Sequence, residues 1–143
     1  MLAMLEIDSA ILAALRDVPE IVALAIFGSR ARGSSRPDSD LDVAVLFVDG
    51  VRESGWRLQG RVAACLSGLA PGGRVDVVVL DEVPELLRQR IFETGRVLLL
   101  KDERRWQELR VQTMREHGDR EPYRRMLREA QARRLAGSAT GHG

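Results

Sequence analysis

The sequence predicts one α/β (α+β) domain, built on a mixed sheet of three or four strands flanked by helices and followed by C-terminal helices. Short apolar runs typical of buried strands alternate with segments whose apolar residues recur at helical spacing. A length of 143 residues, with 45% hydrophobic and 30% charged residues and a net charge of +1, fits one compact domain. The composition excludes collagen-like, simply disordered and large multidomain proteins.

The first part of the chain is expected to contain one helix and then two strands. Asp8 or Ser9 can cap a helix that runs through about residue 17. The short apolar runs at 21–27 and 41–48 predict two buried strands.

The next helix is expected over 51–69, where apolar residues recur at helical spacing before a Pro-Gly-Gly sequence ends the pattern. Cys65 lies within this pattern and is interpreted as a small buried hydrophobe. A single cysteine cannot form an intramolecular disulfide or, alone, a structural zinc site.

A third strand is expected over 75–80, followed by a helix and a short edge strand. Pro84 fits the first turn of that helix, which runs to about Thr94, and Gly95 fits its C-terminal cap. The edge strand is expected over 96–100.

The C-terminal region is expected to form two helices. One runs from about residue 102 to His117 and is ended by Gly118, and Pro122 begins the other. Residues 101–143 carry 11 basic and 7 acidic side chains, a net charge of +4, whereas the rest of the chain carries −3. Such a basic surplus is typical of solvated helices, and the alternative interpretation is a docking surface.

Three aspartates are hard to explain by packing. Asp40 and Asp42 alternate with apolar residues at the start of the second strand, so both carboxylates point to one face. Asp76 interrupts the apolar run of the third strand, where an unpaired carboxylate is costly. Because one helix joins these strands, they are expected to be parallel and to start at the same edge of the sheet. The resulting anionic cluster suits Mg²⁺ or Mn²⁺ and a phosphate-bearing substrate.

A phosphate site is expected just after the first strand, where the segment Gly-Ser-Arg-Ala-Arg-Gly can open a short helix with free N–H groups. Gly28 permits close backbone approach, and Ser29 adds a hydroxyl. Arg30 or Arg32 adds a guanidinium suited to phosphate oxygens. If the first two strands are antiparallel, the Gly28 end of the first strand lies beside Asp40 and the phosphate lies beside the metals.

Together these motifs resemble the nucleotidyltransferase superfamily typified by DNA polymerase β. The resemblance rests on a Gly-Ser pair, ten intervening residues, an Asp-Leu-Asp sequence and a later aspartate on an apolar strand: Gly28, Ser29, Asp40, Asp42 and Asp76. The segment from Gly28 through the second strand is especially similar to the minimal nucleotidyltransferases of prokaryotes. So is the later succession of strand, helix and edge strand.

The resemblance covers about residues 8–117 and implies a polymerase β-like nucleotidyltransferase fold. It divides the chain into a nucleotidyltransferase domain over 1–117 and a C-terminal helical arm with a disordered tail over 118–143.

The resemblance also implies roles for the motif residues. Asp40 and Asp42 would bind both metal ions, and Asp76 would complete one of the two metal sites. The Gly-Ser pair, Gly28 and Ser29, would hold the nucleotide triphosphate.

The family pattern Gly-Ser-x-Ala-Arg-Gly places its arginine at Arg32, which is therefore favoured over Arg30 for phosphate contact. Two Mg²⁺ ions are implied, with Mn²⁺ as a substitute. One would activate the attacking hydroxyl, assisted by Asp76, and the other would hold the triphosphate. Nothing in the sequence identifies an independent general base.

The reaction that the resemblance implies is ATP-dependent transfer of AMP to a hydroxyl group, with release of pyrophosphate. Many minimal nucleotidyltransferases are antitoxins, and members of the family adenylylate a tyrosine of a partner HEPN-type ribonuclease toxin. We take this reaction as the leading hypothesis. A chain this short has little room for its own acceptor domain, which favours a protein substrate.

Two alternatives stay open: a non-catalytic antitoxin that acts by complex formation, and an adenylyltransferase for a small molecule of the aminoglycoside type. Nucleic-acid extension is disfavoured, because aromatic residues make up only 4% of the chain. The sequence shows no secretory or membrane segment, so a cytoplasmic location is expected.

Overall fold

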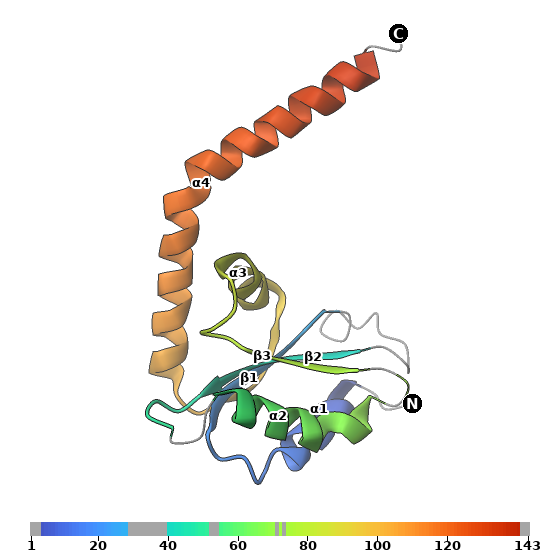
Figure 1. Cartoon of the computed structure of the whole chain (residues 1–143), viewed down its shortest axis with the longest axis vertical. Helices are drawn as coiled ribbons and strands as arrows, with labels where there is room; N and C mark the ends of the chain where they lie inside the picture. Colours follow the sequence, from blue (N-terminus) through green and yellow to red (C-terminus); the bar gives the residue numbers. More distant parts are fainter. Residues whose placement is uncertain (1–3, 29–39, 52–54, 71, 73, 141–143) are drawn as a thin grey trace.

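The computed structural model describes residues 4–28, 40–51, 55–70, 72 and 74–140. These residues form a four-stranded sheet with helices on both faces (Figure 1). The sheet order is β3-β2-β1-β4. The strands are β1 (Ile21–Phe27), β2 (Leu41–Phe47), β3 (Val75–Val79) and β4 (Arg96–Leu100).

The sheet is mixed, as the sequence predicts. β1 pairs antiparallel with both β2 and β4, and β2 pairs parallel with β3. Consequently β2 and β3 begin at one edge of the sheet, where β1 ends. The α/β class and the three or four expected strands are confirmed.

Each face of the sheet has its own apolar core. On one face, α1 (Met4–Ala14) and α2 (Gly55–Leu66) cover large side chains such as Leu24 and Ile26 of β1. On the other face, α3 (Glu85–Thr94) and the start of α4 (Glu103–Thr140) cover the small side chains Ala23 and Ala25. These alanines leave room for the buried ring of Trp106 from α4.

The N-terminal helix begins and ends earlier than the expected 8–17. Asp8 and Ser9 both lie inside α1, so neither acts as its cap; the Asp8 carboxylate forms an ion pair with Arg96 at the start of β4. The buried side chains Ile7 and Ile11 fix the face of α1 that packs on the sheet.

The second helix is shorter than expected, and its last turn becomes the 3₁₀ helix η2 (Ser67–Leu69). Leu58, Val62 and Leu66 form its buried face. The interpretation of Cys65 as buried is wrong: Leu66 occupies the core position, and the neighbouring Cys65 is exposed.

The third helix ends as predicted, with Gly95 as its C-cap, but Pro84 is the N-cap residue just before the helix and not part of its first turn. Gly95 has an extended backbone with φ −71°, so its role does not depend on a left-handed conformation. A Cβ atom there would lie 2.5 Å from the carbonyl oxygen of Ile91, which accepts a hydrogen bond from the Gly95 N–H at 2.7 Å. Glycine is therefore required by close packing.

The C-terminal region differs most from its prediction, because α4 is one helix of 38 residues and the expected break between two helices is wrong. Gly118 and Pro122 both lie within α4. A proline inside a helix removes one backbone hydrogen bond and commonly produces a bend without ending the helix. Figure 1 shows α4 changing direction partway along and then projecting away from the sheet.

The first turns of α4 are fixed to the sheet and to α3. The side chain of Asp102 caps α4 by accepting a hydrogen bond from the Arg105 N–H at 3.0 Å. Arg105 Nη2 lies 3.2 Å from carboxylate oxygens of both Asp49 and Asp81, which follow β2 and β3. None of the helices in the described part of the chain is both long and apolar enough to cross a membrane.

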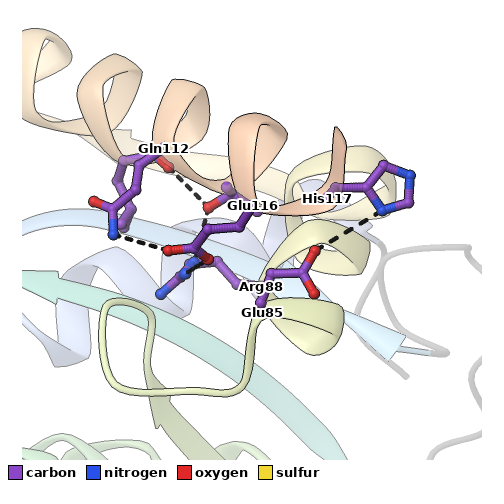
Figure 2. A network of polar contacts seen from close by, with 7 residues as sticks. Glu85, Arg88, Gln112, Glu116 and His117 are labelled. Carbon is purple, nitrogen blue, oxygen red and sulfur yellow. Dashed lines mark hydrogen bonds and ion pairs between the residues drawn. The ribbon is translucent and has the colours of Figure 1, made fainter. Parts of the chain in front are cut away.

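A polar network then joins α3 to α4 (Figure 2). The buried Arg88 of α3 donates hydrogen bonds to Thr113 Oγ1 at 2.8 Å and to Glu116 Oε2 at 2.6 Å. Glu85 and His117 lie 3.8 Å apart at the end of this contact and form an ion pair when His117 is protonated. These contacts fix the direction in which α4 leaves the sheet.

Candidate active site

The edge at which β2 and β3 begin carries two facing carboxylates. Asp42 and Asp76 are direct partners in the parallel ladder between these strands, and both are half-buried. Burial raises the pKa of Asp42, and so do the negative charges of Asp76 and Asp40. A hydrogen bond with Asp76 also favours the protonated form of Asp42. The parallel start that the sequence predicts for these strands is confirmed.

Asp40 lies at the same edge, one residue before β2, and is exposed. Its Oδ1 accepts a hydrogen bond from the backbone N–H of Arg74 at 2.9 Å. The Arg74 carbonyl in turn accepts a hydrogen bond from the Leu41 N–H at 2.8 Å. Asp40 is therefore tied to the segment that enters β3, whereas Asp42 and Asp76 meet each other.

Gly28 lies against the carboxylate pair. It follows β1, whose last residue Phe27 is the register partner of Asp42. Its φ of +73° is in the left-handed region, and a Cβ atom would lie 2.3 Å from Asp42 Oδ2. Only glycine satisfies both conditions. The antiparallel arrangement thus brings the Gly28 end of β1 to the aspartates, in direct contact with Asp42.

The other expected phosphate ligands, Ser29, Arg30 and Arg32, lie outside the described residues. Their roles stay predictions.

The donor set at this edge fits a hard divalent cation. Oxygen atoms of Asp42 and Asp76 face each other, and burial together with like charge makes ionisation of Asp42 costly without a cation. Among the residues that the structure describes, neither carboxylate forms an ion pair with an arginine, lysine or histidine. Carboxylate oxygens are the ligands that Mg²⁺ prefers.

The third carboxylate does not complete a cluster in this conformation. No group of three His, Cys, Asp or Glu side chains within the described ranges is arranged to hold a metal ion. Asp40 instead faces the Arg74 amide. This backbone contact was not predicted, because it depends on the register of β2 and β3 and leaves no signal in residue type.

Comparisons with known proteins agree with this geometry. Residues 9–104 match the family model described as "Polymerase beta, Nucleotidyltransferase". Over 93 residues the chain is 30% identical to the protein adenylyltransferase MntA of Shewanella oneidensis, a match that covers 64% of this chain and 63% of MntA. The chain therefore aligns with less than two thirds of the length of this relative.

Several solved structures share the fold, among them two toxin–antitoxin complexes. A toxin–antitoxin crystal structure with AMP-PNP superposes with a TM-score of 0.64 and 24% identity, covering 87% of this chain and 98% of the other. The MNT antitoxin in complex with a tri-AMPylated HEPN toxin from Shewanella oneidensis gives a TM-score of 0.61 and 22% identity, covering 91% and 99%. At these identities the likeness establishes the fold alone.

The family match includes β1, β2, β3 and β4, and with them Gly28, Asp42 and Asp76 at the shared edge. The chain therefore belongs to the polymerase β nucleotidyltransferase family.

Proposed function

We propose that this chain is an antitoxin that transfers AMP from ATP to a tyrosine hydroxyl of a partner HEPN-type ribonuclease toxin. The observation that carries the proposal is the facing pair of Asp42 and Asp76 with Gly28 packed against it. The similarity to a protein adenylyltransferase supports AMP as the transferred group and a protein as the acceptor.

Some residues at this edge of the sheet are proposed to bind the nucleotide, and others the metal ions. Because Gly28 has no side chain, the Asp42 carboxylate packs against its backbone, so a triphosphate bound at this end of β1 would lie beside the proposed metal ligands. Ser29 and Arg32 are the proposed contacts to the triphosphate, with Arg30 as the second candidate guanidinium.

Asp40, Asp42 and Asp76 are the proposed ligands of two Mg²⁺ ions. When bound, these ions would supply positive charge to the triphosphate and lower the pKa of the attacking hydroxyl, and Mn²⁺ would serve in the same way. The raised pKa of Asp42 supports this role, because added positive charge would favour the ionised carboxylate.

The transfer forms one bond and breaks one. The tyrosine oxygen bonds to the α-phosphorus of ATP, and the bond from that phosphorus to the bridging oxygen of the leaving pyrophosphate breaks. Asp76, half-buried beside Asp42, is the carboxylate proposed to assist removal of the hydroxyl proton.

The proposed division of the chain follows from these roles. Residues 1–117 would form the nucleotidyltransferase domain, and 118–143 an arm that contributes to acceptor recognition. This leaves the acceptor to supply its own recognition surface, which suits a folded protein.

The test incubates the chain with a HEPN-type toxin of the same organism, labelled ATP and Mg²⁺. We expect label on one or more toxin tyrosines, release of pyrophosphate, and loss of toxin ribonuclease activity. Asp42→Asn and Asp76→Asn are expected to lower the transfer rate at least a hundredfold, because each removes a proposed metal ligand.

A matched control is Asp17→Asn, which removes an exposed carboxylate just before β1, at the edge of the sheet opposite Asp42 and Asp76, and should leave the rate unchanged. If the complex forms and wild type transfers no label, the proposed reaction is refuted. If the Asp42 and Asp76 variants neutralise the toxin as well as wild type does, the protein acts by complex formation alone.

A further inference from the structure

Past His117, the side chains of α4 that the structure describes are nearly all exposed. Glu116 and His117 are the last described side chains that contact α3. Between 125 and 136 the described side chains are exposed, apart from the half-buried Ala130. An exposed helix is only marginally stable in water, so a partner that covers this part of α4 would stabilise it.

Arginines and exposed apolar residues recur at one helical phase of α4, before and after its bend. Arg110 and Arg128 are 18 residues apart, which is about five turns of an α-helix, so they lie on one line along the helix, which bends between them. Arg125, Met114 and Leu135 fall close to the same line by the same rule. All five side chains are exposed, Met114 at 61% and Leu135 at 72%.

A cavity of about 410 Å³ lies between α3 and α4, next to Arg110 and Met114. Its lining includes Phe92 from α3 and Arg110, Met114 and His117 from α4. A space of this size accepts a large apolar side chain, with an aromatic ring and a methionine as its walls.

We infer that Arg110, Met114, Arg125, Arg128 and Leu135, here called the α4 docking face, bind an acidic amphipathic helix of the protein acceptor. The arginines would pair with carboxylates of that helix, and Met114 and Leu135 would contact its apolar residues. One apolar side chain would enter the cavity beside Phe92. This inference rests on the proposed function, because it takes the acceptor to be a protein.

The charge pattern favours a protein over a nucleic acid. Residues 118–140 contain six arginines, no lysine and three acidic residues. Acidic side chains placed among the arginines repel a polyanion, whereas arginine and methionine are enriched in protein interfaces. An acidic helix can place carboxylates opposite the arginines and uncharged residues opposite the acidic side chains, which a nucleic acid cannot do.

The attachment of α4 to α3 makes the docking face useful to the active site. Because Arg88 is buried and bonded to both Thr113 and Glu116, the first half of α4 is held in one orientation relative to the sheet. A partner that contacts Arg110, Met114 and the cavity beside them would therefore be held at a fixed position relative to Asp42 and Asp76.

The test measures the affinity of the full chain for the HEPN-type toxin without ATP or Mg²⁺. We expect R110E/R128E to weaken binding about tenfold, because charge reversal replaces attraction with repulsion at two points. The matched control R115E/R133E reverses two exposed arginines with the same spacing on another side of α4, and should change affinity less than about twofold. Both variants should keep the wild-type melting temperature.

Each other outcome overturns either the docking face or the proposed AMP transfer. Equal loss in both variants, or no loss in either, overturns the docking face. It is also overturned if R110E/R128E loses binding to single-stranded RNA while its toxin affinity is unchanged. If R110E/R128E alone loses toxin binding but wild type transfers no AMP with ATP and Mg²⁺, the docking face stands and the proposed reaction fails. If R110E/R128E labels the toxin at the wild-type rate, the docking face is overturned and the proposed reaction stands.

Discussion

At the scale of single residues, Gly28 offers the sharpest test of the site. Gly28→Ala forces an L side chain into φ +73° and places its Cβ 2.3 Å from Asp42 Oδ2. The backbone cost is about 1–2 kcal/mol, and the clash must displace the Asp42 carboxylate. We expect AMP transfer to fall at least tenfold, measured by label incorporation at saturating ATP.

Gly50→Ala separates the backbone cost of a left-handed alanine from the clash with Asp42. Gly50 has φ +74°, and a Cβ atom at this position would meet nothing within 4 Å. This variant should lose a similar free energy of unfolding in urea and retain full activity. If Gly50→Ala lowers activity as much as Gly28→Ala does, the loss comes from reduced stability, and the contact with Asp42 is irrelevant.

Asp42 should lower the stability of the metal-free protein. Because folding raises the pKa of Asp42, the ionised carboxylate lowers the free energy of unfolding, whereas the protonated carboxyl does not. This cost is absent below the unfolded-state pKa and is fully present above the raised folded-state pKa. In EDTA, Asp42→Asn is therefore expected to be more stable than wild type at pH 7, and the difference should shrink toward pH 4.

Urea unfolding from pH 4 to pH 8 measures this difference, with Asp17→Asn as the exposed control. Added Mg²⁺ should stabilise wild type and have little effect on Asp42→Asn. A variant that is less stable than wild type at pH 7 in EDTA would show that Asp42 supports the fold, contrary to its proposed metal role.

Part of the site could be predicted from residue types alone. Asp42 and Asp76 interrupt apolar strands, where a carboxylate has no packing role, so their pairing at one edge followed from the parallel connection. The contact of Asp40 with the Arg74 amide could not be predicted, because every residue other than proline presents the same backbone N–H group. Likewise, the exposure of Cys65 depends on one helical step relative to Leu66.

At the scale of elements, Arg88 should determine how firmly α4 is attached to α3. Arg88→Ala removes two hydrogen bonds made by a side chain that is 7% exposed and leaves the buried Thr113 with one partner fewer. We expect a loss of about 2 kcal/mol in the free energy of unfolding, since Glu116 is partly hydrated and recovers some of its solvation.

The control is Arg104→Ala, which breaks the exposed pair with Glu108 at 2.9 Å within α4. Exposed pairs of this spacing contribute about 0.3–0.5 kcal/mol. Chemical denaturation compares the two variants. Equal losses would mean that the network between the helices adds no more than a surface ion pair.

The strands could be predicted more accurately than the helices. Apolar runs define β1 and β2, because both faces of these strands are covered and nearly every position is buried, with Asp42 as the polar exception. Helix α4 could not be predicted as one element. Gly118 and Pro122 have low helix propensity, and local sequence rules assign them to a break, yet the helix continues through them.

At the scale of the whole molecule, the exposed end of α4 should contribute to recognition and little to folding. Between 125 and 136 the described side chains are exposed apart from Ala130. A chain that stops after residue 124 is therefore expected to keep its melting temperature to within about 4 °C, the shift that corresponds to roughly 1 kcal/mol or less.

The same truncation should separate acceptor binding from chemistry. It removes Arg125, Arg128 and Leu135 from the α4 docking face and leaves Gly28, Asp42 and Asp76 in place. We expect KM for the toxin to rise about tenfold with kcat nearly unchanged, because the lost contacts act on binding more than on the transition state. Hydrolysis of ATP to AMP and pyrophosphate, measured without toxin, should stay at the wild-type rate. A fall in that hydrolysis rate would place the arm in the catalytic domain itself, and an unchanged KM would show that the acceptor docks elsewhere on the molecule.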